Sequence, residues 1–101
     1  MYFNLRSVNV VYTGIISTTL TDLYTVIENC LLRIRIKQGN MTLSGTSSIH
    51  VYVDGVVILS IDGGPAYQGD STIYYAKKGD VITCQSNNAQ LSGTVTIYKY
   101  N

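Results

Sequence analysis

The chain has 101 residues, of which 46% are hydrophobic and 13% are charged, and its formal net charge is +1. This length predicts a single domain over residues 1–101, with charged residues about half as frequent as usual. The near-neutral pI of 7.7 argues against nucleic-acid binding, and no apolar run approaches the roughly 20 residues of a membrane-spanning helix.

The composition favours a protein that is partly covered by other subunits. A domain of this size buries only about two thirds of the surface that its unfolded chain exposes, so a partner would add stability. The N-terminus reads Met-Tyr-Phe-Asn-Leu-Arg and lacks the basic segment and unbroken apolar stretch of a secretion signal. We therefore expect a protein that is made in the cytoplasm.

Along the chain, hydrophobic residues alternate with polar ones, and this period of two residues is typical of strands. The best helical candidate, residues 19–30, is rich in Thr and β-branched residues, which favour strands. Turn signals divide the chain into eight predicted strands, residues 7–13, 23–27, 30–38, 49–53, 56–61, 72–76, 81–86 and 93–100. Short strands at this spacing predict an all-β fold, a single antiparallel β-sandwich that is jelly-roll-like.

The turn signals have different strengths. Gly14 and polar residues within 17–22 indicate a loop after the first strand. Asp54-Gly55 lies between two β-branched runs and predicts a hairpin with a type I′ turn, which needs positive φ at both residues. Residues 62–70 indicate a loop because Pro65 has no backbone donor for a ladder. Residues 77–80 predict a tight turn.

The predicted strand 30–38 has the clearest two-faced pattern. Leu32, Ile34 and Ile36 form an apolar face, and they alternate with Arg33, Arg35 and Lys37. A solvated sheet face is the simpler interpretation of the cations, and docking onto acidic residues of a neighbouring protein is the other. Three charges without interleaved aromatic residues make a poor nucleic-acid groove.

The sequence has nine tyrosines, one phenylalanine and no tryptophan. Tyrosine suits the edge of a core and also suits surfaces that a subunit or ligand covers. Tyr74 and Tyr75 must point to opposite faces of their strand, whereas Tyr98 and Tyr100 share one face. The candidate interface residues are Tyr74, Tyr75, Tyr98, Tyr100, Arg33, Arg35 and Lys37. A candidate ligand loop comprises Tyr67, Asn87, Asn88 and Gln90.

Catalytic and metal-binding patterns are weak. His50 is the only histidine and lies within a predicted strand, and most acidic residues neighbour a glycine, which is turn chemistry. A calcium site between Asp62 and Asp70 has no supporting acidic repeat.

Cys30 and Cys84 make no metal motif, and we expect two reduced, buried thiols, with one disulfide as the alternative. The glycosylation triplet at residues 40–42 is attributed to chance. We expect no enzyme, cofactor or metal site.

Several short segments carry a family resemblance. Leu23-Tyr24-Thr25-Val26, residues 31–37 and the segment Val51-Tyr52-Val53-Asp54-Gly55 resemble a pattern of tailed-bacteriophage virion proteins. Residues 77–82 are similar to a turn and strand in the jelly-roll heads of phage fibres and of trimeric C1q- and TNF-like domains. The resemblance spans residues 23–100, and it departs at Ile27-Glu28-Asn29, where related sequences carry a proline-alanine-glycine type of turn. It implies a homotrimeric β-sandwich attached to a capsid or tail.

Three hypotheses follow for function. The first is a non-enzymatic phage structural protein of the virion, a capsid head-fibre or decoration subunit that forms a homo-oligomer, most simply a trimer, and docks on other virion proteins. The alternative is a carbohydrate- or receptor-binding module of a tail fibre. There Tyr67, Tyr74 and Tyr75 would stack on a host surface glycan, with Asn87, Asn88 and Gln90 as polar partners. The weakest is a small hydrolase or lyase centred on His50.

Overall fold

The computed structural model describes residues 8–38, 48–62, 69–87 and 93–100. These residues form eight strands and no helix, so the predicted all-β class is confirmed, and none of them belongs to a helix that could cross a membrane. The strands are β1 (Val8–Ile15), β2 (Thr21–Thr25), β3 (Cys30–Gln38), β4 (Ser48–Val53), β5 (Val56–Asp62), β6 (Gly69–Ala76), β7 (Val81–Ser86) and β8 (Gly93–Tyr100).

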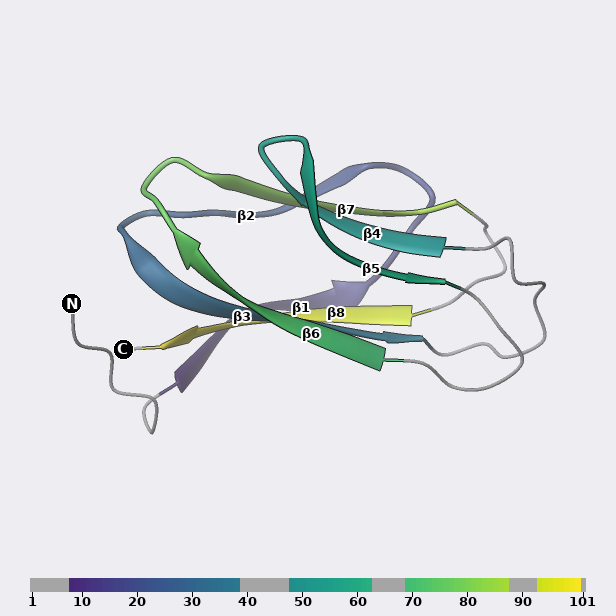
Figure 1. Cartoon of the computed structure of the whole chain (residues 1–101), viewed down its shortest axis with the longest axis horizontal. Helices are drawn as coiled ribbons and strands as arrows, with labels where there is room; N and C mark the ends of the chain where they lie inside the picture. Colours follow the sequence, from purple (N-terminus) through teal and green to yellow (C-terminus); the bar gives the residue numbers. More distant parts are fainter. Residues whose placement is uncertain (1–7, 39–47, 63–68, 88–92, 101) are drawn as a thin grey trace.

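Two four-stranded sheets pack face to face as a sandwich (Figure 1). Sheet 1 has the strand order β1-β8-β3-β6 and sheet 2 the order β2-β7-β4-β5, and every pairing is antiparallel. Apart from the β4–β5 hairpin, consecutive strands alternate between the two sheets. This alternation gives the jelly-roll sandwich that the strand spacing predicted.

The core lies between the sheets and is built from the apolar members of the alternating pattern. In β3, Leu32, Ile34 and Ile36 are fully buried, whereas the cations between them are exposed. Each fully buried aliphatic side chain of this kind contributes roughly 1.5–3 kcal/mol relative to an exposed one. The opposing layers are completed by Ile49, Val51, Ile82, Val95 and Ile97.

Three of the four edge strands contain a bulge. The register of β1 shifts at Val11, that of β2 at Leu23, and that of β5 at Ile58. An extra residue lets two successive side chains face the same way, and these three side chains all pack against the core. The bulges also interrupt edges that could otherwise pair with another chain.

The predicted loop over Gly14 and residues 17–22 is wrong at both ends. β1 continues through Gly14, which pairs with Val95, and β2 already begins at Thr21, which pairs with Cys84. A Cβ on Gly14 would lie 2.5 Å from the Tyr12 hydroxyl oxygen, so the glycine leaves room for the Tyr12 side chain. The loop expected over residues 62–70 is also shorter, because Asp62 belongs to β5 and β6 begins at Gly69.

The predicted Asp54-Gly55 hairpin is confirmed. Asp54 has φ of 49° and Gly55 has φ of 84°, the two positive values that a type I′ turn needs. Asp54 also binds β7, because its Oδ1 accepts a hydrogen bond from the Val81 amide at 2.9 Å and its own amide donates to the Val81 carbonyl at 3.0 Å.

Two more connections join this hairpin at the same end of the sandwich. The Val26 amide donates to the Asp80 carbonyl at 2.9 Å, and the Gly79 amide donates to the Val26 carbonyl at 2.8 Å. The Asn29 side chain accepts from the Lys78 amide at 2.9 Å. We call residues 26–29, 54–55 and 77–80 the loop cluster; it holds the ends of both sheets together.

Candidate interaction surface

The cationic side chains of β3 form a row across the middle of the outer face of sheet 1. In register, Arg33 lies between Ile73 of β6 and Tyr98 of β8. Two residues further along the strand, Arg35 lies between a serine and a threonine, and Lys37 follows. All three side chains are exposed. We call Arg33, Arg35 and Lys37 the cationic row.

The cationic row is not neutralised by carboxylates within the described residues. There the one ion pair joins Lys99 to Glu28, away from the row. This pair lowers the pKa of Glu28, mainly through the hydrogen bond from Lys99, and the same hydrogen bond raises the pKa of Lys99. Arg33 instead donates from Nη2 to the Ser71 hydroxyl at 3.4 Å. The row therefore presents unpaired positive charge.

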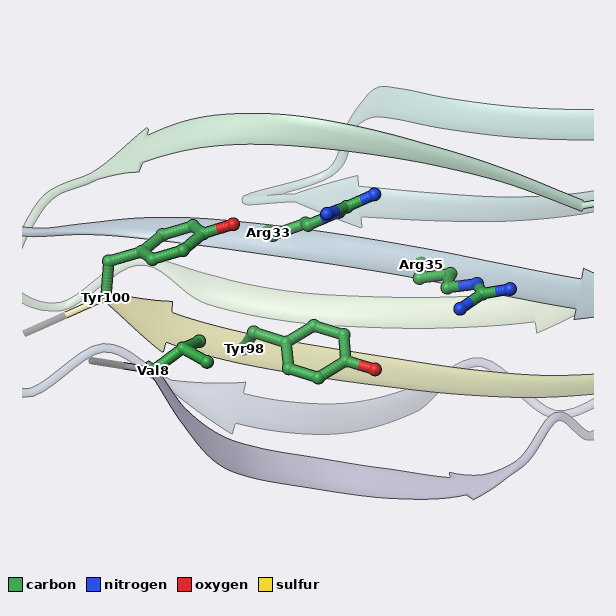
Figure 2. A pocket seen from close by; sticks show the side chains of 5 residues that line it. All are labelled: Val8, Arg33, Arg35, Tyr98 and Tyr100. Atoms are coloured by element: carbon green, nitrogen blue, oxygen red, sulfur yellow. The ribbon is translucent and has the colours of Figure 1, made fainter. Parts of the chain in front are cut away.

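Two adjoining hollows of about 160 and 150 Å³ run between β3 and β8. Arg35 and Tyr98 line both of them. Figure 2 shows Arg33 and Arg35 projecting from β3, with the Tyr98 and Tyr100 rings lying along β8 beside them. One wall of this groove is therefore cationic and the other is aromatic, and hydroxyls of Thr94 and Thr96 extend the second wall.

Exposed apolar side chains lie on both sides of the groove. On β1, Val10 is 56% exposed and Ile15 is 79% exposed, and on β6, Ile73 is 54% exposed. Val8 and Tyr75 are each 44% exposed. The strand order β1-β8-β3-β6 thus gives an apolar flank, a tyrosine and threonine strand, the cationic row and a second apolar flank.

Six of the seven predicted interface residues share this face. Tyr98 and Tyr100 lie together as the alternation predicts, and Tyr75 lies on β6 across the cationic row. Tyr74 points the other way: it pairs with buried Leu32 and packs against the core. Desolvation raises the pKa of Tyr74, and the carboxylates of Asp80 and Asp54 add to the effect.

The apolar flanks were not among the predicted site residues. Val8, Val10, Ile15 and Ile73 sit in strand patterns that look the same whether the apolar positions face inward or outward. The sequence does indicate that one apolar residue near position 10 faces outward. Val10 and Val11 are adjacent, and in a regular strand two adjacent side chains cannot both face the core. The bulge in β1 resolves this by turning Val11 inward and leaving Val10 outside.

The candidate ligand loop is described only in part. Asn87 connects β7 to β4, because its Oδ1 accepts from the Ser48 amide at 2.8 Å and its amide donates to the Ser48 carbonyl at 3.0 Å. This is a structural role at the described end of the loop. Tyr67, Asn88 and Gln90 lie outside the described residues, as does the triplet at residues 40–42.

The other sequence candidates do not assemble into a site. His50 lies on the outer face of sheet 2, edge to face with Tyr52 at a ring-centroid distance of 6.0 Å. The described residues contain no group of three His, Cys, Asp or Glu side chains able to hold a metal. Asp70 accepts a hydrogen bond from the Ser71 amide. Cys30 and Cys84 are free, buried and on different sheets, and burial raises the pKa of Cys84 to about 11.

Comparison with known proteins adds information on the fold. No protein-family model matches the sequence, and no curated protein matches it. Among solved structures, rabbit GITRL superposes with a TM-score of 0.64 at 16% identity, over 79% of this chain and 75% of that one. Pika GITRL superposes with a TM-score of 0.65 at 15% identity, over 90% of this chain and 96% of that one. At such identities the likeness establishes a shared TNF-like jelly-roll sandwich.

Proposed function

We propose that this chain is a non-enzymatic structural subunit of a tailed-phage virion, a capsid head-fibre or decoration protein, that self-associates as a trimer. One observation carries the self-association: the outer face of sheet 1 exposes aliphatic side chains on β1 and β6, with tyrosines on β6 and β8. The phage assignment rests on the sequence resemblance over residues 23–100. The GITRL structures bear on the fold alone.

The composition of this face is that of a covered surface. Protein interfaces are enriched in tyrosine and arginine, and these residues supply many of the strongest contacts. Here two tyrosines and two arginines line a groove, with exposed valine and isoleucine side chains on either side.

The charge on this face favours a ring over a two-fold dimer. A two-fold contact presents the same patch on both subunits, so it would bring two cationic rows together without carboxylates between them. A heterologous contact places the face of one subunit against a different surface of the next, and it closes into a ring when the rotation allows. A three-membered ring is the smallest such assembly.

Light scattering after size-exclusion chromatography tests the self-association. We expect a particle of three times the chain mass of 11.1 kDa. Ile73→Asp places a charge on the outer face of sheet 1 and should yield monomers. Val57→Asp is the matched control, because Val57 is 50% exposed on sheet 2. A wild-type monomer at micromolar concentration, or equal effects of both variants, would overturn the proposed interface.

The location in a virion needs a separate measurement. Mass spectrometry of purified particles of the encoding phage should detect this chain at a stoichiometry in multiples of three per attachment point. Immunogold labelling should then place it on the head. Absence of the chain from washed, purified particles would refute the virion assignment while leaving the self-association to be judged on its own test.

A further inference from the structure

The cationic row needs counter-charges if the outer face of sheet 1 is covered. A charged group that is removed from water costs several kcal/mol unless a well-placed opposite charge replaces the lost hydration. Within the described ranges, no carboxylate pairs with Arg33, Arg35 or Lys37, because the one ion pair there is Lys99 with Glu28. The inference below rests on the proposed function, since coverage of this face is what creates the demand.

The chain's own carboxylates are largely in use elsewhere. Four of those that the structure describes already accept a hydrogen bond or an ion pair, namely those of Glu28, Asp54, Asp70 and Asp80. Asp22 is exposed, but it lies on β2, an edge strand of the other sheet. Among the carboxylates that the structure describes, one such group cannot balance three cations per subunit, so the compensating charges are best supplied by a different chain.

The spacing of the row specifies the shape of that partner. Alternate residues of a strand point to the same side and lie about 6.6–6.8 Å apart. An extended peptide with acidic residues at alternate positions repeats its carboxylates at the same distance. The planar guanidinium forks of Arg33 and Arg35 match carboxylates in a bidentate manner, which adds specificity to the charge attraction.

The groove offers space and contacts for such a segment. Each hollow has room for several water molecules or for a side-chain carboxylate. The Tyr98 and Tyr100 rings on the opposite wall give apolar surface; in Figure 2 the Tyr100 hydroxyl points toward Arg33, and the Tyr98 ring lies along β8. The threonines of β8 add hydroxyl groups along the same direction as the row.

We infer that the groove between β3 and β8 binds an extended acidic segment of another protein, with Asp or Glu at alternate positions, while the apolar flanks on β1 and β6 contact the next subunit. Each member of the cationic row takes one carboxylate, and the tyrosine wall packs against the segment between its acidic residues. The partner recognised by this chemistry is an acidic polypeptide strand on the surface to which the subunit docks.

Fluorescence anisotropy with two short labelled peptides tests the inference on the full chain. One peptide alternates Glu and Thr, and the other has the same composition with all Glu residues in one block. We expect the alternating peptide to bind at least about tenfold more tightly, since one well-formed charged contact contributes roughly that factor. Arg33→Gln with Arg35→Gln should remove at least about tenfold of the affinity.

Lys77→Gln with Lys78→Gln is the matched control, because it removes two exposed cations of the loop cluster and leaves the row intact. This variant should bind the alternating peptide as the wild type does. Equal binding of the two peptides, or equal loss in both double variants, would overturn the inference. Tighter binding of polygalacturonate with the same arginine dependence would also overturn it, in favour of an acidic saccharide.

Light scattering on the same samples separates this inference from the proposed function. A trimer that binds neither peptide retains the assembly and rejects the acidic segment. A monomer that binds the alternating peptide rejects the assembly and retains the groove as a docking site.

Discussion

The two sheets share one core but differ on the sides that face away from it. The outer face of sheet 1 carries large exposed aliphatic groups, tyrosines and three cations that form no ion pair with a described carboxylate. On sheet 2 the outward positions of β4 and β7 are filled by half-buried side chains, those of His50, Tyr52, Thr83 and Gln85, and the edge strand β5 exposes two valines. The inner faces are equally apolar, so the difference does not arise from folding. On this difference we assign the proposed contact to sheet 1.

The comparison can be sharpened within one strand, because β8 contributes to both sides of sheet 1. Ile97 is fully buried against sheet 2, whereas its neighbour Thr96 lies on the outer face. We expect Ile97→Ala to lower the free energy of unfolding by about 2–5 kcal/mol, through lost burial and the cavity left behind. Urea denaturation should show a change below about 1 kcal/mol for Thr96→Ala. Similar losses in both variants would contradict the assignment of inner and outer faces.

The loop cluster belongs to both sheets, so a change there should not discriminate between the faces. Asp54→Ala removes the acceptor of the Val81 amide and should cost about 1–2 kcal/mol of unfolding free energy. Asp54→Asn keeps an acceptor oxygen and tolerates positive φ, so most of the stability should remain. Urea midpoints of the two variants check this, and an unchanged midpoint in Asp54→Ala would show that the cluster does not stabilise the fold.

Two tyrosines, one on each sheet, test directly which outer face makes the contact between subunits. Tyr75 lies on the β6 flank of sheet 1, and Tyr52 lies on the outer side of sheet 2. If sheet 1 is the contact side, Tyr75→Ala should weaken self-association about tenfold, a typical effect for a tyrosine at an interface. Tyr52→Ala should leave it unchanged. Sedimentation equilibrium measures both, and a larger effect of Tyr52→Ala would exchange the roles of the two faces.

The smallest expected effect concerns the one paired cation, Lys99, which contrasts with the unpaired row. The pKa of Glu28 is lowered in the folded state, so its contribution is present above the ordinary pKa of 4.5 and is lost as pH falls through the lowered value. The pKa of Lys99 is raised, so its contribution is present below 10.5 and is lost as pH rises through the raised value.

Thermal midpoints between pH 7 and about pH 3 should therefore show a slight acid-dependent loss in the wild type that Glu28→Gln lacks. The loss should shrink in high salt, because the Glu28 side chain is 64% exposed and its charge is screened. An identical pH profile for the two proteins would show that the ion pair does not contribute to stability.

The sequence predicted the strands well because each is a short apolar alternation between strong turn signals. The hairpin at Asp54-Gly55 was predictable from two residues, since few sequences satisfy two positive φ values. The ends of strands were less predictable. Thr21 and Asp22 look like loop residues, yet they pair with Cys84 and Thr83 because β7 offers them a ladder. Pairing between residues so far apart in the sequence cannot be predicted from a short stretch of it.

The candidate surface was predictable in its centre and not at its margins. Alternation alone placed Arg33 and Arg35 on one side of β3 and Tyr98 with Tyr100 on one side of β8. It could not show that β3 and β8 are neighbours, which is what joins the two sets into a groove. The bulges were also beyond reach, because a bulge depends on what the partner strand presents. Val10 and Ile15 therefore became visible as surface only in three dimensions.

The two thiols have a consequence for where the folded chain can exist. Both are buried and free, and they are the only cysteines in the sequence. The native fold therefore contains no disulfide bond. Reaching it requires neither oxidation of the thiols nor reduction of a disulfide.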